Sequence, residues 1–214
     1  MPTMYSSEKF EQLRTDYAGY ASWAIWKHGR DNKADTSCIR ENLHFLHARY
    51  VFVGLNISKA LERDWQNFHG GKHDRKLQYA LNDTELRGAY LTDMYKNIVE
   101  PKATQLHSYI ESRPELLQSN VDTFRKEMSD IEVNINSTFV ILSAATSKTA
   151  DHFNRFFRPH FPSNPVIFQR HYSSRGTDQE WVESIWNLLG IEADYQSTGY
   201  YGQSLPPFQR KVYH

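Results

Sequence analysis

Four stretches of the chain are rich in apolar residues and show no alternation between polar and apolar positions. They lie at 50–53, 88–93, 138–143 and 165–171. Runs of this kind are typical of strands that are buried on both faces of a parallel sheet. The first run is followed by Gly54, at which we expect the strand to stop.

The segments around these runs carry apolar residues at the spacing of a helix face, and several begin with Ser, Thr, Asp or Pro, which favour helix starts. We predict helices over roughly 7–21, 37–46, 74–81, 101–111, 121–131, 149–157 and 178–189. Strands that alternate with helices indicate an α/β fold of three layers, in which helices cover both faces of a central four-stranded parallel sheet. We expect one domain over 1–190 and an irregular C-terminal tail over 191–214.

Composition narrows the class of protein. Lys plus Arg and Asp plus Glu both number 25, so the formal net charge is zero and gives no general signal of nucleic-acid binding. The single cysteine, Cys38, excludes an internal disulfide framework. No apolar run is long enough to span a membrane, and the N-terminus lacks the pattern of a signal peptide. We therefore expect a cytoplasmic protein that does not bind membranes.

Three of the predicted strands end at a polar side chain: Asn56, Asp93 and His171. Parallel strands place their carboxyl ends at one edge of a sheet, which is where ligands bind in open α/β folds. Each residue also has a plain structural interpretation, as a turn residue, a helix cap and a half-buried histidine respectively. Their shared position predicts that the three side chains converge on one pocket.

Two of these residues lie in motifs that resemble those of the uracil-DNA glycosylase superfamily, in particular its mismatch-specific and single-strand-selective branches. The segment 54–58, Gly-Leu-Asn-Ile-Ser, is similar to the first family motif, G-x-N-P-[GS]. The segment 171–175, His-Tyr-Ser-Ser-Arg, is similar to the second, H-P-S-P-R. Ile57 and Tyr172 stand where the family has proline. The likeness covers roughly residues 48–190.

The resemblance implies a monofunctional DNA glycosylase, which flips a base out of DNA and hydrolyses the bond between base and sugar. Asn56 would position the attacking water, and His171 would donate a hydrogen bond to O2 of the departing base. Phe68 occupies the place of the aromatic ring that stacks on the flipped base. Arg175 would enter the duplex as a wedge, while Ser173 and Ser174, together with Ser58, would hold the flanking phosphates.

The residue at the base-reading position differs from that of the uracil-specific branches, which carry an amide there. Asp93 cannot both accept from N3 and donate to O4 of uracil when it is ionised, because a carboxylate only accepts hydrogen bonds. A protonated Asp93 can accept from N4 and donate to N3 of cytosine. Ser58 replaces the tyrosine that blocks C5 in strict uracil enzymes. Together these residues predict a C5-modified cytosine, such as hydroxymethylcytosine or its glucosylated form, and a role in anti-phage defence.

Contacts to the C5 substituent are expected from Tyr172, Trp65 and the segment 69–72. The family chemistry implies DNA as the partner, no metal or other cofactor, and a monomer. His69 and His73 are spaced like a zinc pair, but they flank two glycines and predict no metal site.

Three other interpretations stay open. The chain would be an ordinary repair glycosylase for uracil or another deaminated base if Asp93 did not read the base. It would be a catalytically silent relative that binds nucleic acid or a protein if the altered motifs had lost activity. A small-molecule binder of flavodoxin-like type is the third, although the chain has no Gly-rich phosphate loop.

Overall fold

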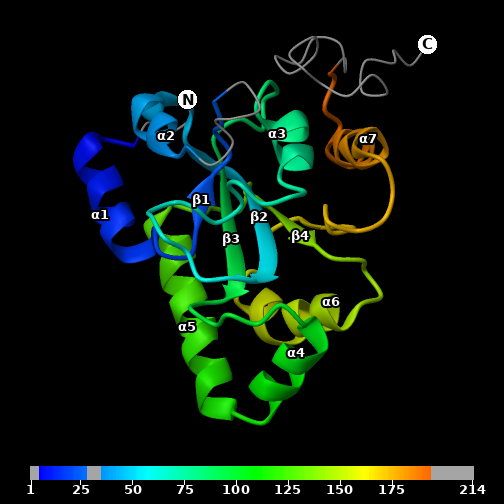
Figure 1. Cartoon of the computed structure of the whole chain (residues 1–214). Coiled ribbons are helices and arrows are strands. Elements are labelled where there is room, and N and C mark those ends of the chain that lie inside the picture. The colour runs from blue at the N-terminus through cyan, green and yellow to red at the C-terminus, as the bar shows by residue number, and fades with distance from the viewer. Residues whose placement is uncertain (1–4, 28–34, 194–214) are drawn as a thin grey trace.

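The computed structural model describes residues 5–27 and 35–193. The chain has an α/β fold with a five-stranded mixed sheet, mostly parallel, that is flanked by helices (Figure 1). The strands are β1 (Ser22–Trp23), β2 (His47–Asn56), β3 (Ala89–Tyr95), β4 (Thr138–Leu142) and β5 (Val166–Gln169). The α-helices are α1 (Ser7–Tyr17), α2 (Ser37–Glu41), α3 (Arg75–Leu81), α4 (Ala103–Glu111), α5 (Pro114–Asp130), α6 (Lys148–His152) and α7 (Asp178–Leu189).

The strands are arranged in the order β1-β3-β2-β4-β5. The four predicted strands are all present and pair in parallel, as their apolar runs indicated. The prediction of a four-stranded, wholly parallel sheet was nevertheless wrong, because β1 pairs antiparallel with β3 at one edge. A strand of two residues is too short to show any periodicity, so its place is decided only by its backbone partners on β3.

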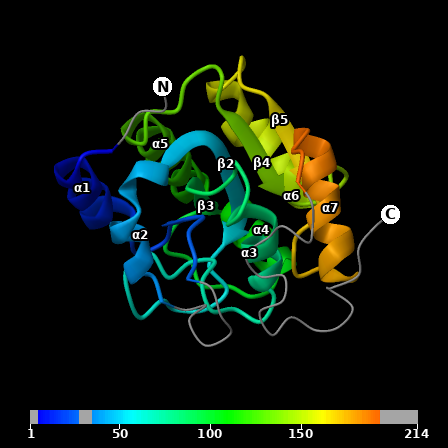
Figure 2. The same ribbon diagram turned by 90° about the horizontal axis from the view of Figure 1, so that it is seen from above.

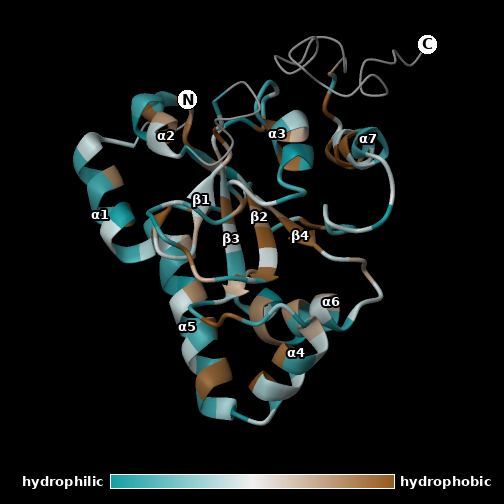
Figure 3. Ribbon diagram, in the orientation of Figure 1, coloured by the Kyte–Doolittle hydropathy of each residue, from teal (hydrophilic) through white to brown (hydrophobic). Residues whose placement is uncertain are grey.

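Alternate residues of the central strands face two separate cores. On β2, Val51 and Val53 pack into one core and Phe52 packs into the other, and all three are fully buried. Residues from α1, α4 and α5 complete the first core, whereas residues from α3 and α7 complete the second. Figure 2 shows these helices around the sheet, and Figure 3 shows that β2 and β4 are largely hydrophobic while the helices are striped. Burial on both faces explains why the strands lack alternation.

Several element boundaries differ from the predictions. The first long strand does not stop at Gly54 but continues to Asn56, and β3 continues past Asp93 to Tyr95. The predicted helix over 37–46 is divided into α2 and a 3₁₀ turn at Leu43–Phe45. Helix α5 begins earlier than expected, at Pro114, which is a favoured first residue of a helix. The helix expected at 149–157 starts at Lys148 and passes into a π-helical turn at Phe153–Phe157.

The predicted tail at 191–214 lies outside the described residues from 194 onward. None of the described helices is long and apolar enough to cross a membrane. In Figure 1 the arrowheads of β2 and β3 point toward α4 and α6, which marks the carboxyl edge of the sheet.

Candidate functional site

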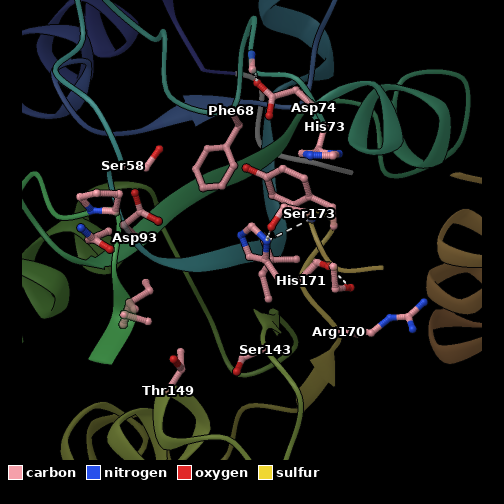
Figure 4. Close-up of a pocket in the computed structure, with 18 of the residues that line it drawn as sticks. Ser58, Phe68, His73, Asp74, Asp93, Ser143, Thr149, Arg170, His171 and Ser173 are labelled. Carbon is pink, nitrogen blue, oxygen red and sulfur yellow. Dashed lines mark hydrogen bonds between the residues drawn. The ribbon is translucent and has the colours of Figure 1, made fainter. Parts of the chain in front are cut away.

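A cavity of about 600 Å³ opens at the carboxyl edge of the sheet. Strand β2 lies between β3 and β4. The crossover that leaves β2 leads to β3 on one side of it, and the crossover that leaves β3 leads to β4 on the other side. Such a topological switch point is where open α/β sheets commonly bind ligands. The lining comes from the ends of the parallel strands and from the segments that follow each of them: the loop between β2 and α3, the loop between β3 and α4, the segment from β4 into α6 and the loop after β5 (Figure 4). Asn56, Asp93 and His171 all line this cavity.

Asn56 is the last residue of β2, and its side chain is fixed by the loop that follows β3. Its Nδ2 atom donates to the backbone carbonyl oxygens of Ile57, Ile98 and Glu100 at 2.8–2.9 Å. These acceptors decide the orientation of the amide, because only its nitrogen can donate. Oδ1 has no hydrogen-bond partner among the described residues. Asn56 therefore presents an acceptor atom to whatever occupies the cavity.

Gly54 makes room for two side chains on one wall of the cavity. It faces Asp93 in the parallel register of β2 and β3. A methyl group at Gly54 would overlap Oδ1 of Asp93 and would lie 3.4 Å from Cζ of Phe68. The glycine is thus explained by close packing within a strand and not by a turn. Its missing side chain lets a carboxyl group and an aromatic ring lie side by side.

Asp93 is only 2% exposed, although it points toward the cavity (Figure 4). It lies inside β3 and not at the strand end where we expected it. Burial raises the pKa of its carboxyl group to about 7, while a hydrogen bond from Asn67 and the charge of Lys96 act in the opposite direction. Near neutral pH the group is therefore present in both its protonated and its ionised form. It can donate or accept a hydrogen bond there.

His171 lies two residues beyond β5, and its loop selects one tautomer of the imidazole. The backbone N–H of Ser173 donates to Nδ1 at 3.1 Å, so Nδ1 is an acceptor and the ring proton lies on Nε2. Burial, together with the nearby His73, lowers the pKa of His171 to about 4, which keeps the ring neutral at pH 7. Nε2 has no hydrogen-bond partner among the residues that the structure describes. It is a donor available to a ligand.

Tyr172 connects the loop after β5 with the loop before α3. Its ring is stacked on that of His171, with centroids 4.3 Å apart, and is tilted toward Phe68 at 6.4 Å. Its hydroxyl group is hydrogen bonded to the carboxyl group of Asp74. Asp74 in turn accepts the backbone N–H of Gly71 at 2.6 Å. Tyr172, at the position where the motif that this loop resembles has proline, therefore packs against both the predicted base-stacking ring and the predicted donor.

The residues predicted to contact DNA differ in their exposure and in whether their hydroxyl groups are already hydrogen bonded. Ser58 and Ser173 line the cavity and are exposed, but the hydroxyl group of Ser173 donates to Nδ1 of His171 at 2.7 Å and is used inside the loop. Ser174 also lines it, but its hydroxyl group donates to the carbonyl oxygen of His171 at 2.6 Å and is used inside the loop. Arg175 is exposed and lies outside the cavity lining.

Some residues of the site had no signal in the sequence. Asn67 lines the cavity and donates a hydrogen bond to Asp93, yet its partners are distant along the chain and form no motif. Of the residues expected near a C5 substituent, Tyr172, Gly71 and Lys72 line the cavity. The expectation was wrong for Trp65 and His69, which are buried away from the cavity lining because their rings pack in the cores, against Trp23 and Trp26 respectively. His69 and His73 are not part of any potential metal-binding group among the described residues.

Comparison with known proteins does not identify the function of this site. No family model, no curated protein and no solved structure matches the chain. Its function must therefore be inferred from the chemistry of the cavity: a fixed amide acceptor, a buried carboxyl group with a pKa near 7, an imidazole donor and an aromatic wall.

Proposed function

We propose that the chain is a monofunctional DNA glycosylase that removes a C5-modified cytosine and leaves an abasic site. The observation that carries this proposal is the gathering of Asn56, Asp93 and His171, from three separate strands or strand ends, around one cavity of about 600 Å³. The buried aromatic ring of Phe68 borders the same cavity. A site that reads, stacks and cleaves a flipped base needs these groups within reach of one ligand.

Asp93 would read the edge of the base. A protonated carboxyl group accepts from the N4 amino group of cytosine through one oxygen and donates to N3 through the other. The pKa of about 7 keeps a proton available at neutral pH, either on Asp93 or shared with N3. Phe68 would cover one face of the base. Ser58, small and exposed, would leave space at C5 for a hydroxymethyl or glucosyl-hydroxymethyl group.

Bond cleavage would follow from Asn56 and His171. The oxygen of a water molecule attacks C1′ of the sugar while the C1′–N1 bond breaks, and the electron pair of that bond leaves with the base. Oδ1 of Asn56 would accept a hydrogen bond from this water and position it. The Nε2–H group of His171 would donate to O2, where negative charge develops. Asn56 is neutral and removes no proton, so the water proton passes to solvent and the reaction is slow.

The remaining parts of the proposal concern DNA and fold family. Arg175 is exposed beside the cavity loop, as a residue that enters the duplex outside the base pocket must be. Ser173 is exposed, but its hydroxyl group and backbone N–H both donate to Nδ1 of His171, so a flanking phosphate would be held by the exposed Ser58. The order of the parallel strands and the place of the cavity support a three-layer fold of the uracil-DNA glycosylase type. The enzyme would act as a monomer without a cofactor, in defence against phage with modified DNA.

The test uses matched oligonucleotides, single-stranded and duplex, that carry hydroxymethylcytosine, its glucosylated form or uracil. Alkali-labile abasic sites are measured after incubation with the full chain. We expect product from a modified cytosine, and a loss of at least about 100-fold in Asn56→Ala because the water is no longer positioned. Asn164→Ala is the matched control, since Nδ2 of Asn164 likewise holds two loop carbonyl oxygens but lies outside the cavity lining.

The result also separates the alternatives. Product from uracil alone would replace this proposal with a repair glycosylase. Binding of an oligonucleotide without any abasic product would indicate a silent relative. Equal activity of Asn56→Ala and the wild-type protein would refute the assigned site.

A further inference from the structure

Asn67 is locked as a hydrogen-bond donor to Asp93. Its Nδ2 atom donates to Oδ2 of Asp93 at 2.7 Å and to the backbone carbonyl oxygen of Tyr20 at 2.7 Å. Its Oδ1 atom accepts the backbone N–H of Phe68 at 3.1 Å. If the amide rotated by half a turn, its oxygen would face the Tyr20 carbonyl and its nitrogen would face an N–H donor. The side chain therefore has one orientation.

This donor makes the two oxygens of Asp93 chemically different. Oδ2 is an acceptor for Asn67, whereas Oδ1 lies against Gly54 and accepts no hydrogen bond among the described residues. When the carboxyl group is protonated, its proton therefore belongs on Oδ1. The position of that proton matters, because a neutral carboxyl group can pair with cytosine or with uracil. It pairs with cytosine when its O–H faces N3, and with uracil when its O–H faces the oxygen on C4.

The order of the strands decides which oxygen faces which atom of the base. Tyr20, which accepts a hydrogen bond from Asn67, lies two residues before the edge strand β1, and β3, with Asp93, is the next strand. Then comes β2, with Gly54 beneath Oδ1, and His171 follows β5 at the far side. A base whose O2 atom points toward His171 has N3 next along its edge and its C4 substituent farthest away. Oδ1 then faces N3, and Oδ2 faces the substituent on C4.

We propose that Asn67 is a specificity-determining residue: by occupying Oδ2 of Asp93 it places the carboxyl O–H opposite N3, so that the site reads cytosine and rejects uracil. The inference rests on the proposed function and deepens it. Asn67 acts through Asp93 and is a positioning residue. Uracil in the same pose would bring N3–H against the O–H group of Asp93 and its O4 atom against the acceptor Oδ2.

Three other groups influence the protonation of Asp93. Lys96, just beyond the end of β3, favours the ionised form, and Glu127 of α5 favours the protonated form. Tyr172, from the loop after β5, faces Asp93 as a neutral phenol, because burial raises its pKa. None of these is hydrogen bonded to the carboxyl group of Asp93 in the described part of the chain. Asn67 is thus the contact that distinguishes its two oxygens.

The test compares two bases in two variants. Asn67→Leu has nearly the same shape but no donor, and Asn67→Ala removes the side chain in case the leucine does not pack. The measurement is the ratio of kcat/KM for hydroxymethylcytosine to kcat/KM for uracil in matched oligonucleotides. We expect the ratio to fall by about tenfold or more in both variants, because the proton is then free to move between the two oxygens. Asn164→Ala is the control and should leave the ratio unchanged.

A second readout needs no DNA. The carboxyl carbon of Asp93 is followed by NMR as the pH is raised, with Asp93→Asn used to assign its signal. The midpoint should move upward by roughly one pH unit in Asn67→Leu, because a hydrogen bond that favours the ionised form is lost. An unchanged ratio or an unmoved midpoint overturns the inference. A midpoint that moves in a protein that releases no base sustains the contact between Asn67 and Asp93 and refutes the glycosylase instead.

Discussion

Two buried carboxyl groups lie on either side of strand β3, and their surroundings differ. Glu127, from α5, is fully buried in a closed polar cluster. It forms an ion pair with Lys96 at 2.5 Å, and its Oε1 atom accepts from the hydroxyl groups of Tyr90 at 2.9 Å and Thr92 at 2.7 Å. Asp93 points to the opposite side of the strand and borders the cavity.

The second carboxyl group has far less compensation. Asp93 accepts a hydrogen bond from Asn67 through one oxygen, and its other oxygen has no hydrogen bond among the described residues. Buried polar groups in proteins are nearly always hydrogen bonded, so a carboxyl oxygen without such a bond at a cavity wall indicates a ligand-binding group. Burial of an acid therefore does not by itself mark a functional site. A buried acid that lacks a hydrogen-bond partner on one oxygen and borders an open cavity is the stronger sign of such a site.

The largest effect that would test this contrast is on the closed cluster. Lys96→Met leaves the charge of Glu127 buried without its partner, so we expect the free energy of unfolding to fall by about 3–5 kcal/mol. Urea denaturation at pH 7 measures the change.

A double variant is the control for that substitution. Lys96→Met combined with Glu127→Gln removes both charges while it keeps an oxygen for Tyr90 and Thr92. It should recover more than half of the lost stability. If Lys96→Met stays within about 1 kcal/mol of the wild-type protein, Lys96 does not compensate the buried charge of Glu127, and the contrast with Asp93 fails.

Most of the fold could be predicted from local pattern. The four parallel strands follow from apolar runs that have no alternation, and most helices follow from periodicity and from starting residues such as Thr177, which forms a full capping box with Glu180. The edge strand β1 could not be predicted. Its two residues, Ser22 and Trp23, show no pattern of their own, and they form a strand only because β3 offers free backbone groups.

The site was predictable only where it coincides with strand ends. Asn56 ends β2, and His171 follows β5, so their nearness could be inferred from the topology of a parallel sheet. Asn67 could not be inferred in this way. It lies in an irregular loop and acts through contacts with Tyr20 and Asp93, which are 47 and 26 residues away along the chain. Contacts of this kind depend on tertiary packing and leave no local signal.

The next effect concerns the uncompensated acid itself. The pKa of Asp93 is about 7 in the folded protein and 3.8 for the free side chain, so the folded state binds more protons between these values. Its contribution to stability therefore falls as the pH rises from about 4 to about 7 and stays low above that. Asp93→Asn removes this loss. We expect it to be more stable than the wild-type protein by roughly 2–3 kcal/mol at pH 8 and by little at pH 4, by urea denaturation.

A matched substitution shows whether the gain belongs to the buried position. Asp16 is exposed on α1, and Asp16→Asn should give no comparable change between pH 4 and pH 8. Because Asn67 holds an acceptor opposite C4, Asp93→Asn alone should keep the preference for cytosine, whereas Asp93→Asn combined with Asn67→Leu lets the amide turn and should shift base preference toward uracil. A stability difference for Asp93→Asn that is constant with pH would mean that Asp93 ionises as freely as an exposed acid.

The smallest effect tests the space that Asp93 occupies. Gly54→Ala places a methyl group where Oδ1 of Asp93 lies and crowds the ring of Phe68, so the carboxyl group must move. We expect a loss of about 1–2 kcal/mol in the free energy of unfolding, together with a lower rate of the proposed base release, because overpacking displaces the carboxyl group that we propose reads the base. Gly19→Ala is the control, since no atom lies within 4 Å of the place that its new methyl group would occupy. Adding Asp93→Ala to Gly54→Ala should restore the stability but not the activity, and a double variant that stays destabilised would place the clash elsewhere than at Asp93.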